Sequence, residues 1–500
     1  MKDFTQETLE LLKKSGGLQK AGITTSTGLV FYSLEPQAKL LYPVLTPFRN
    51  IIPRVGSTTG GFGTAEHWKT ITGINSTNIY AGVQEGQRNK TTTPTENDQM
   101  ASYVTLEMEG AVSFQADWAG MGFDDVKALS ILNNLQNLML QEENVILNGN
   151  TSLQLGTANT PTFATNATGG SISDGSTNYA YVVGLTAFGF QAAGGQQVPV
   201  SSGATLTPVV SRTNVDASTT TYGNGIGHVS AAGGPFTTSG GNLSTVTLTV
   251  VPKVGEFGYA WFWGTTSGAG NAQLVAVTSE PTVTFSANTT ATYPANSTGL
   301  STDNSTNAVA FDGLITQALN NNGYYKNLAG NTLTADGFGG VVEIDAALKY
   351  FWDTYRLAPT DIWCDSQTIR DITKHVLAGS SNPGFRYDMA PNVQSAGGMI
   401  AGNLVTTYVN KYGVNGALGI NLHIHPNMPT GTIYFDMTRL PDGWNHSRVG
   451  APRRIKTRQE YRQIEWPVTT LQYTYGIMVD EILQVYVAFG TGVITGIAAG

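Results

Sequence analysis

Two histidines in the segment "LHIHP" come closest to the spacing of a metal site. His423 and His425 are two residues apart in a strand-like stretch, so their side chains project from the same face. The sequence fixes no third ligand, and a pair of strand histidines without a metal is the favoured interpretation. Cys364 is the only cysteine and lies between Trp363 and Asp365 in a buried strand, where packing is the expected role. One cysteine also excludes an intrachain disulfide and a multi-cysteine zinc site.

Three pairs of neighbouring carboxylates could supply acid and base groups. They lie at a helix start, on a helix face predicted to be solvated, and in a strand where one side chain points outward: Asp124-Asp125, Glu142-Glu143 and Asp480-Glu481. The chain has no nucleophile elbow, no HExxH motif, no phosphate-binding loop and no dinucleotide fingerprint. The sequence therefore predicts a protein that is not an enzyme and has no cofactor and no metal.

One basic cluster stands out in "RVGAPRRIKTRQEYR". Its cationic residues are Arg448, Arg453, Arg454, Lys456, Arg458 and Arg462. They could face nucleic acid or pair with acidic residues of a neighbouring subunit, and we favour the second interpretation. The net charge of -8 argues against a protein that coats nucleic acid by neutralising its charge.

The composition indicates a chain of two or three domains with an unusually uncharged surface. The chain has 500 residues, and its charged share of 12% is about half the usual level. No apolar run approaches the roughly 20 residues of a membrane span, and the first residues lack a signal-peptide pattern. Residues 3–14 are typical of a short amphipathic docking helix. Residues 40–55 contain Pro43, Pro47 and Pro53, which predicts an extended segment without a regular helix.

A long hairpin and a long helix follow this segment. Residues 66–71 and 79–83 are strand-like, a polar run covers 84–99, and residues 103–115 alternate strictly between apolar and polar. Such a hairpin is marginal in water and needs a partner surface. The segment 124–150 has apolar residues at helical spacing, with Asp124 or Asp125 as N-cap and Gly149 as terminator.

The segment from Thr151 to Asn304 is almost uncharged and contains several short alternating strands, which predicts a β-sandwich of immunoglobulin-like size. Its stretch "GYAWFWG" holds Tyr259, Trp261 and Trp263. These aromatic side chains could stack on a sugar, although a strand packed on both faces is the simpler interpretation. The rest of the chain reads as helix, strand and helix around residues 361–364, followed by further strands, and completes an α+β body.

The order of these parts resembles the major capsid proteins of tailed bacteriophages, with the Hong Kong 97-type capsid fold. The resemblance rests on the proline-rich arm, the hairpin with "AGVQEGQ", the long helix ending "ENVILNG" and the final strand "DEILQVYVAF". It covers residues 27–150 and 312–494. It implies an N-terminal arm (1–63), an E-loop hairpin (64–100) and a peripheral strand with a spine helix (101–150). An inserted Ig-like sandwich (151–305), an axial domain (306–430) and the remaining strands and C-terminus (431–500) follow.

The resemblance also implies which residues meet other subunits. In the family the E-loop lies across the adjacent subunit, and the intersubunit contact candidates here are Trp68, Lys69, Glu85, Arg88, Lys90, Arg386, Arg453, Arg454 and Arg458. Some family members form Lys–Asn isopeptide bonds through this loop. Most lack that chemistry, so a covalent crosslink is not expected at Lys69 or Lys90.

The expected function is therefore structural. The chain would self-assemble as hexamers and pentamers into an icosahedral shell around double-stranded DNA, in the host cytoplasm, and become part of the virion. A separate scaffolding protein, a portal and a decoration protein are the expected partners, and no membrane is involved. The alternatives are an encapsulin-like compartment or, from another class, a carbohydrate-binding adhesin that uses the inserted β domain.

Overall fold

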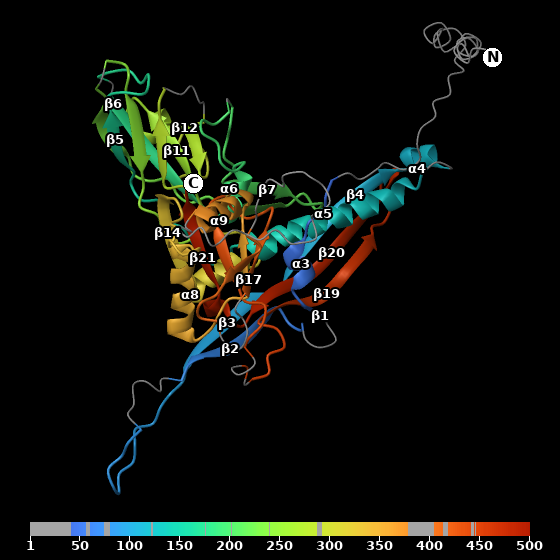
Figure 1. Ribbon diagram of the computed structural model, residues 1–500. Coiled ribbons are helices and arrows are strands. Elements are labelled where there is room, and N and C mark those ends of the chain that lie inside the picture. The colour runs from blue at the N-terminus through green and yellow to red at the C-terminus, as the bar shows by residue number, and fades with distance from the viewer. Residues whose placement is uncertain are drawn as a thin grey trace, which may run out of the picture.

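The computed structural model describes residues 42–56, 61–74, 81–121, 124–175, 177–201, 203–239, 241–287, 293–378, 405–413, 419–441, 445 and 447–500. The chain is a mixed α+β protein with three packed regions and a long hairpin that leaves the body (Figure 1).

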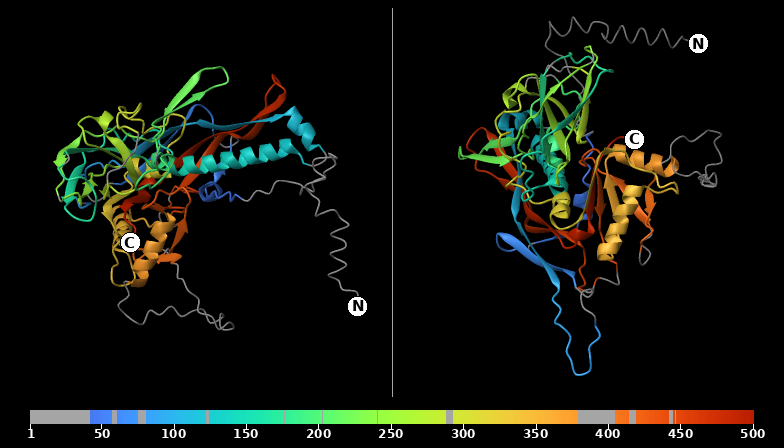
Figure 2. Two further views of the ribbon diagram at one scale, coloured as in Figure 1. Left: turned by 90° about the horizontal axis from the view of Figure 1, so that it is seen from above. Right: turned by 90° about the vertical axis from the view of Figure 1, so that its left-hand side faces the viewer.

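The first region, here called the spine layer, is a four-stranded sheet covered by one long helix. The strand order is β1 (Arg54–Val55), β19 (Arg453–Glu465), β20 (Gln472–Val485), β4 (Val104–Ser113), and only the β1–β19 pair is parallel. The helix α5 (Val126–Asn148) runs along the sheet for about 35 Å (Figure 2). The short helix α4 (Phe114–Gly120) follows β4 directly.

The alternation of β4 and the helical spacing of α5 explain why these two elements meet. Val112 of β4 and Leu138 of α5 pack in one cluster with Tyr475, Ile477 and Val479 of β20. The side chain of Asp125 accepts a hydrogen bond from the N–H of Ala128 (2.9 Å), which makes it the N-cap that the sequence predicts.

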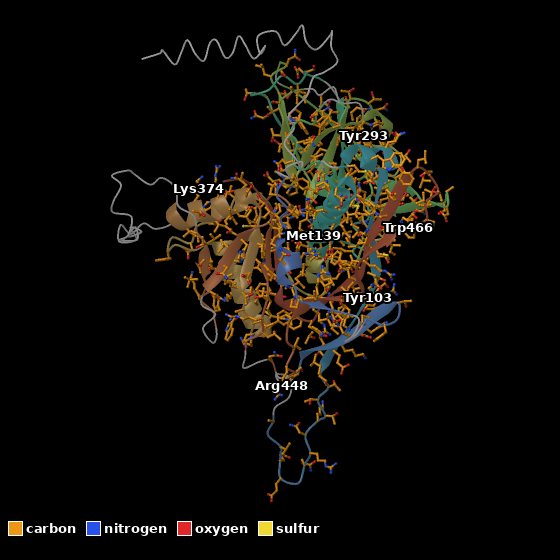
Figure 3. All side chains as sticks on the ribbon, turned by 90° about the vertical axis from the view of Figure 1, so that its right-hand side faces the viewer. Tyr103, Met139, Tyr293, Lys374, Arg448 and Trp466 are labelled. Atoms are coloured by element: carbon orange, nitrogen blue, oxygen red, sulfur yellow. The ribbon has the colours of Figure 1, made fainter. Side chains whose placement is uncertain are left out.

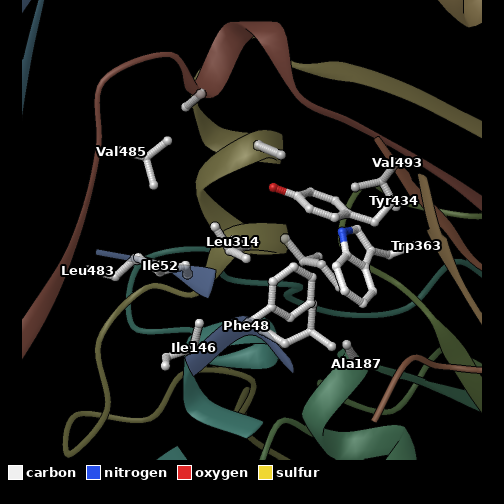
Figure 4. Packing of buried hydrophobic residues seen from close by; sticks show 14 of the residues in the cluster. Phe48, Ile52, Ile146, Ala187, Leu314, Trp363, Tyr434, Leu483, Val485 and Val493 are labelled. Carbon is white, nitrogen blue, oxygen red and sulfur yellow. The ribbon is translucent and has the colours of Figure 1, made fainter. Parts of the chain in front are cut away.

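The expectation of a helix-free segment at residues 40–55 is wrong. A short helix, α3 (Pro47–Ile51), begins at Pro47. Proline is tolerated at the first helical position because its missing N–H would have no partner there. The helix places Phe48, which is fully buried, in the middle of a cluster with Trp363, Tyr434 and Leu314 (Figure 4).

The long hairpin consists of β2 (Ala65–Gly73) and β3 (Thr95–Ser102), which pair antiparallel. We call residues 65–102 the hairpin arm. The return strand lies partly inside the polar run 84–99. Of the predicted strand 79–83, residues 81–83 are not in a strand, and residues 79 and 80 lie outside the described residues. Residues 81–96 are all exposed and extend away from the body (Figure 1).

The second region, here called the compact region, contains a mixed six-stranded sheet and three helices. The strand order is β14 (Tyr324–Asn331), β21 (Gly492–Ile497), β18 (Ile433–Asp436), β15 (Asp361–Cys364), β17 (Gly419–Ile424), β16 (Thr407–Val409). The helices are α7 (Leu314–Asn320), α8 (Val342–Tyr355) and α9 (Ser366–Ala378). The helix α8 ends at Arg356, which adopts a left-handed conformation three residues before Pro359.

The third region, here called the insert, holds two facing sheets within residues 151–305. One sheet has the order β13 (Thr282–Phe285), β10 (Thr245–Thr249), β5 (Thr162–Asn166), and the other β12 (Gln273–Thr278), β11 (Gly258–Gly264), β6 (Thr177–Leu185), β9 (Gly233–Thr237). Its remaining elements are α6 (Ala187–Ala192), the hairpin β7 (Val209–Thr213) and β8 (Thr219–Gly223), and a 3-10 turn, η3 (Ala269–Asn271). A second 3-10 turn, η4 (Ala488–Gly490), belongs to the body.

The two ends of the insert lie side by side. The N–H of Asn307 donates to the carbonyl of Asn150 (2.7 Å), and the N–H of Gly313 donates to the carbonyl of Gly149 (2.8 Å). The carboxylate of Asp312 accepts a hydrogen bond from the N–H of Thr151 (2.7 Å). The chain therefore leaves and re-enters the body at one place.

Candidate interaction surfaces

The hairpin arm is fastened to the body at its foot, and residues 81–96 of the arm are exposed. The indole of Trp68 is buried and donates to the carbonyl of Val485 (3.1 Å). Lys69, in contrast, is exposed, as are Glu85, Arg88 and Lys90 in the connecting loop. Of the predicted contact residues, Trp68 thus packs on its own chain, while the other four are accessible to a partner.

A charged network fixes the point where the arm leaves the body. The hydroxyl of Tyr103 donates to Glu66 (3.0 Å), and Lys456 of β19 forms an ion pair with the same carboxylate (2.9 Å). Burial alone would raise the pKa of Glu66, but the hydrogen bonds from Lys456 and Tyr103 outweigh it and hold the pKa below its usual value. Tyr103 lies at the base of the arm (Figure 3).

Two groups of large apolar side chains are exposed. On the hairpin arm they are Ile71, Ile74, Val83 and Met100, each more than half exposed. At the far end of the spine layer they are Trp118, Met121, Trp466, Val468 and Leu471, here called the tip patch. Exposed apolar groups gathered on projections are typical of protein–protein contacts.

The basic cluster is largely neutralised inside its own chain. Arg453 is buried and forms an ion pair with Asp436, so it cannot reach a neighbouring subunit or nucleic acid. Arg458 bonds to Asp480 (2.7 Å). Arg454 bonds to Gln484 (2.7 Å) and Tyr486. These contacts give three of the cationic residues partners in their own chain, and the role of the cluster toward another molecule stays a prediction. Arg448 and Arg462 are exposed, and Arg386 lies outside the described residues.

Glu143 is fully buried, although the sequence predicts a solvated helix face. Its carboxylate accepts the backbone N–H groups of Phe48 (2.8 Å) and Arg49 (2.7 Å), and it lies 2.7 Å from Nε2 of His425. The N–H of Asn427 donates to Nδ1 of His425 (3.1 Å), so the imidazole proton is on Nε2 and points at Glu143. The prediction failed because the end of α5 enters the body and is covered on all sides.

Glu142 is fully buried as well and holds two arginines. It contacts Nε of Arg49 (3.0 Å), the guanidinium of Arg54 and the hydroxyl of Tyr461. The guanidinium of Arg54 also forms an ion pair with Glu481 (2.7 Å). Burial raises the pKa of Glu481, and the charge of Arg54 opposes this rise only in part. Asp480 and Glu481 are therefore both buried, which corrects the expectation that one of them points outward. We call Glu142, Glu143, Arg49, Arg54, Tyr461, Glu481 and His425 the ionic hub.

The two histidines contact different carboxylates. His423 lies 3.0 Å from Asp361 and stacks on Trp363, whereas His425 belongs to the ionic hub. Among the described residues no group of three or more His, Cys, Asp or Glu side chains is placed to hold a metal. Cys364 is buried, and burial raises the pKa of its thiol, as expected for a packing residue.

The aromatic residues of "GYAWFWG" lie inside the insert. Trp261 and Tyr259 are buried between the two sheets, and the indole of Trp261 donates to Thr278 (2.8 Å). Ala260 and Phe262 pack on the opposite face of the same sheet. The strand is thus packed on both faces, and Tyr259 and Trp261 are not available to a sugar at the surface. Trp263 is partly buried and donates to Asn178 (3.2 Å).

No family model matches the chain, and no curated protein matches it. In the described part of the chain, no helix is both long and apolar enough to span a membrane.

The chain is similar to solved structures of capsids and of an encapsulin. It shares 11% identity with the capsid of a native GTA particle, over 96% of this chain and 99% of that chain, at a TM-score of 0.40. For the capsid of cyanophage A-1(L) the identity is 10%, over 95% and 99% of the two chains, at 0.41. For an encapsulin complex from Synechococcus elongatus it is 6%, over 95% of both, at 0.39. All three TM-scores are below 0.5.

The ionic hub is the part of the molecule that sequence reasoning missed. One signal was present: Glu142 and Glu143 stand four and three residues before the buried Ile146, at the end of α5 that enters the core. The partners of the two carboxylates are about 90 to 320 residues away in sequence, beyond the reach of local periodicity.

Proposed function

We propose that the chain is the structural subunit of a closed protein shell, the major capsid protein of a tailed phage, which encloses double-stranded DNA. The hairpin arm is the observation that carries this proposal. The long spine helix on its sheet, the compact region and the arm support the proposal, because the resemblance implies parts of this kind.

The arm needs a surface outside its own chain. A two-stranded hairpin is marginal in water, and here the loop of residues 81–94 is exposed at every position. Ile71 is 62% exposed and Ile74 is 75% exposed. An adjacent copy of the chain supplies the missing cover, because one arm per subunit laid on the next subunit gives a contact that repeats around a ring.

A closed shell needs a further contact between rings. The tip patch lies on α4 and on the turn between β19 and β20, at the end of the spine layer away from the compact region (Figure 1). Tips from neighbouring rings would bury Trp118, Trp466 and Leu471 together. Stable contacts of this kind bury on the order of 2,000 Å² or more.

The charge distribution supports enclosure of DNA without sequence-specific binding. The net charge is -8, and Arg453, Arg454 and Arg458 already have partners in their own chain. We therefore propose that hexamers and pentamers of this chain form in the host cytoplasm around a separate scaffolding protein, with a portal and a possible decoration protein. The insert would be an Ig-like domain on the outer surface.

Electron microscopy of the purified chain, expressed alone and together with its scaffolding protein, tests the proposal. We expect shells, rings or capsomers. Persistent monomers under both conditions would overturn it. Shells that carry a packaged enzyme instead of DNA would favour an encapsulin-like compartment.

A matched pair of variants tests the role of the arm. Ile71→Asp with Ile74→Asp places charges on the exposed arm and is expected to give folded subunits that do not assemble. Val215→Asp, at a position of the insert that is 95% exposed, is the control and is expected to assemble normally. Unchanged circular dichroism confirms folding, and normal shells from the arm variant would contradict the assigned contact.

A further inference from the structure

A pocket of about 480 Å³ lies at the foot of the hairpin arm. Three parts of the chain form its walls: β3 with the start of β4, the residues on both sides of the insert junction, and α7. Tyr103, which is labelled in Figure 3, belongs to the wall on the side of the arm. We call this cavity the foot pocket. The arm, the insert and the body thus meet around one cavity.

One wall of the foot pocket contains a buried amide with an unused acceptor. The side chain of Gln99 is 8% exposed, and its Nε2 donates to Oδ1 of Asn321, directly after α7 (3.1 Å). Asn97, two residues earlier on β3, donates to the same oxygen (3.1 Å). Oε1 of Gln99 is buried and accepts no hydrogen bond from any residue that the structure describes. A buried carbonyl oxygen without a donor is costly, so this wall favours a ligand that donates hydrogen bonds.

The charges that line the foot pocket are all negative. Asp98 and Asp312 belong to the lining, and none of the described residues in it is a lysine, an arginine or a histidine. Asp312 already accepts hydrogen bonds from Thr151 (2.7 Å) and Ser152 (2.6 Å). Asp98 is exposed, and its strand partner Lys69 is exposed and is not part of the lining. The pocket therefore favours a cation that is also a hydrogen-bond donor.

The remaining lining is partly apolar and suits an alkyl chain better than a bare metal ion. Trp68 and Phe311 are buried residues of the lining, and Met100 is 62% exposed. Aromatic rings attract ammonium groups as well as alkyl groups. A metal ion needs far less space than this pocket offers. Moreover, the described part of the chain has no group of three or more His, Cys, Asp or Glu placed to hold a metal.

We propose that the foot pocket binds a primary ammonium group carried on an alkyl chain. The ammonium group has three N–H donors, which serve the free acceptor of Gln99 and the carboxylate of Asp98. The alkyl chain packs against Trp68 and Phe311. A free diamine and the lysine side chain of another molecule present this same group. The proposal does not depend on the shell function, because every wall of the pocket belongs to one subunit.

Calorimetric titration of the full chain with cadaverine, a diamine with five carbons, tests the proposal. We expect saturable binding of one molecule per chain, and no binding of 1-pentanol, which has the same alkyl length without the charge. Asp98→Asn removes a carboxylate and Gln99→Leu removes the unused acceptor, so each should weaken binding at least five-fold. Glu85→Gln removes an exposed carboxylate elsewhere on the hairpin arm and should bind as the wild type does. No saturable binding, or equal affinity in all four proteins, would overturn the proposal.

Two further titrations identify the kind of ligand. Displacement of cadaverine by an equal concentration of Mg²⁺ would assign the pocket to a metal ion and overturn the proposal. Nα-acetyl-lysine methylamide represents a lysine of another molecule. If it binds more tightly than cadaverine, the natural ligand is a lysine side chain, and the reverse order assigns the pocket to a free diamine.

Hydrogen exchange of the wild-type chain locates the bound amine. Saturating cadaverine should slow the exchange of the β3 amides and of the last α7 amides at least three-fold, and it should leave β12 of the insert unchanged. Protection elsewhere, with none at β3, would contradict the assigned site. Asp98 is exposed, so Asp98→Asn is expected to fold and decides the titration even if Gln99→Leu does not fold.

Discussion

Glu142 and Glu143 are neighbours in sequence but hold different parts of the molecule. Successive residues on a helix point about 100° apart, so Glu142 meets Arg49, Arg54 and Tyr461, while Glu143 meets the start of α3 and His425. The two side chains thereby connect the spine helix to the first described segment, to β19 and to the compact region. A buried carboxylate of this kind matters most when it is removed, because its cationic partners remain buried.

Glu142→Gln is expected to lower the free energy of unfolding by about 3–5 kcal/mol, since it leaves Arg49 and Arg54 without their shared charge. Urea unfolding at neutral pH measures the change. The control is Glu465→Gln, which removes the exposed partner of Lys127 (2.8 Å) and should cost less than about 1 kcal/mol. A Glu142 variant as stable as the control would show that the hub is not a structural centre.

Glu256 is a second buried carboxylate, in the insert. It is 1% exposed and accepts the backbone N–H of Lys253 (2.8 Å). Burial raises the pKa of Glu256 to about 7, against the opposing effect of Lys253. The residue stands close to the compact region, because Tyr325 of β14 donates to the carbonyl of Lys253 (3.2 Å).

The stability of the insert should therefore fall as pH rises from about 5 to 8. In this range unfolded Glu256 is ionised, whereas folded Glu256 keeps its proton up to its raised pKa, so each step upward in pH favours the unfolded form. The full loss is about 3 kcal/mol. Hydrogen exchange of the β6 and β11 amides, corrected for intrinsic rates, measures it. Glu256→Gln should remove most of this pH dependence, and an unchanged profile in that variant would contradict the assignment.

At the scale of elements, the sequence predicts those helices and strands whose residue spacing lies within one segment. The sequence predicts α5, its cap at Asp125, the alternation of β4 and the strand β15, because each depends on spacing within one segment. It missed α3, α4 and the return strand β3. α3 begins with a proline and is held by Glu143, which is 95 residues from Phe48. β3 is polar because most of its residues are exposed, so composition alone could not distinguish it from a loop.

The end of the spine helix is sensitive to side-chain volume. A Cβ added at Gly149 would lie 2.2 Å from the carbonyl oxygen of Phe311, where the two ends of the insert meet. Gly149→Ala should therefore destabilise the protein by about 1–3 kcal/mol. Gly450→Ala is the matched control, because a Cβ there has no atom within 4 Å. Thermal unfolding compares the two variants. Equal unfolding midpoints would show that the backbone around Gly149 and Phe311 can shift to accommodate a Cβ at little cost.

At the scale of the whole molecule, the insert is attached at one place yet shares a core with the body. Its ends meet through the hydrogen bonds of Asn150 and Asn307. Ala187 and Phe257 of the insert pack in the same cluster as Phe48, Phe311 and Trp363. The sequence predicts the boundary from a change in composition, but it has no signal for the shared packing, which depends on side chains brought together by the fold.

Replacing residues 151–306 with a two-glycine linker should leave a soluble body that still assembles. The body should lose about 3 kcal/mol or more of stability, because the cover that Phe257 gives to the shared cluster is removed. Gel filtration, electron microscopy and thermal unfolding measure these effects. Insoluble protein from the deletion would count against the insertion model, whereas full stability would show that the shared packing is unimportant.

The closeness of the insert's two ends also has an evolutionary consequence. A coding segment for another compact domain with adjacent termini could enter at Asn150 and Asn307 without changing the hairpin arm or the tip patch. A related chain could then acquire, exchange or lose this domain by one recombination event, and selection on the domain would act separately from selection on the body. The same position is the natural place to graft a foreign protein for display.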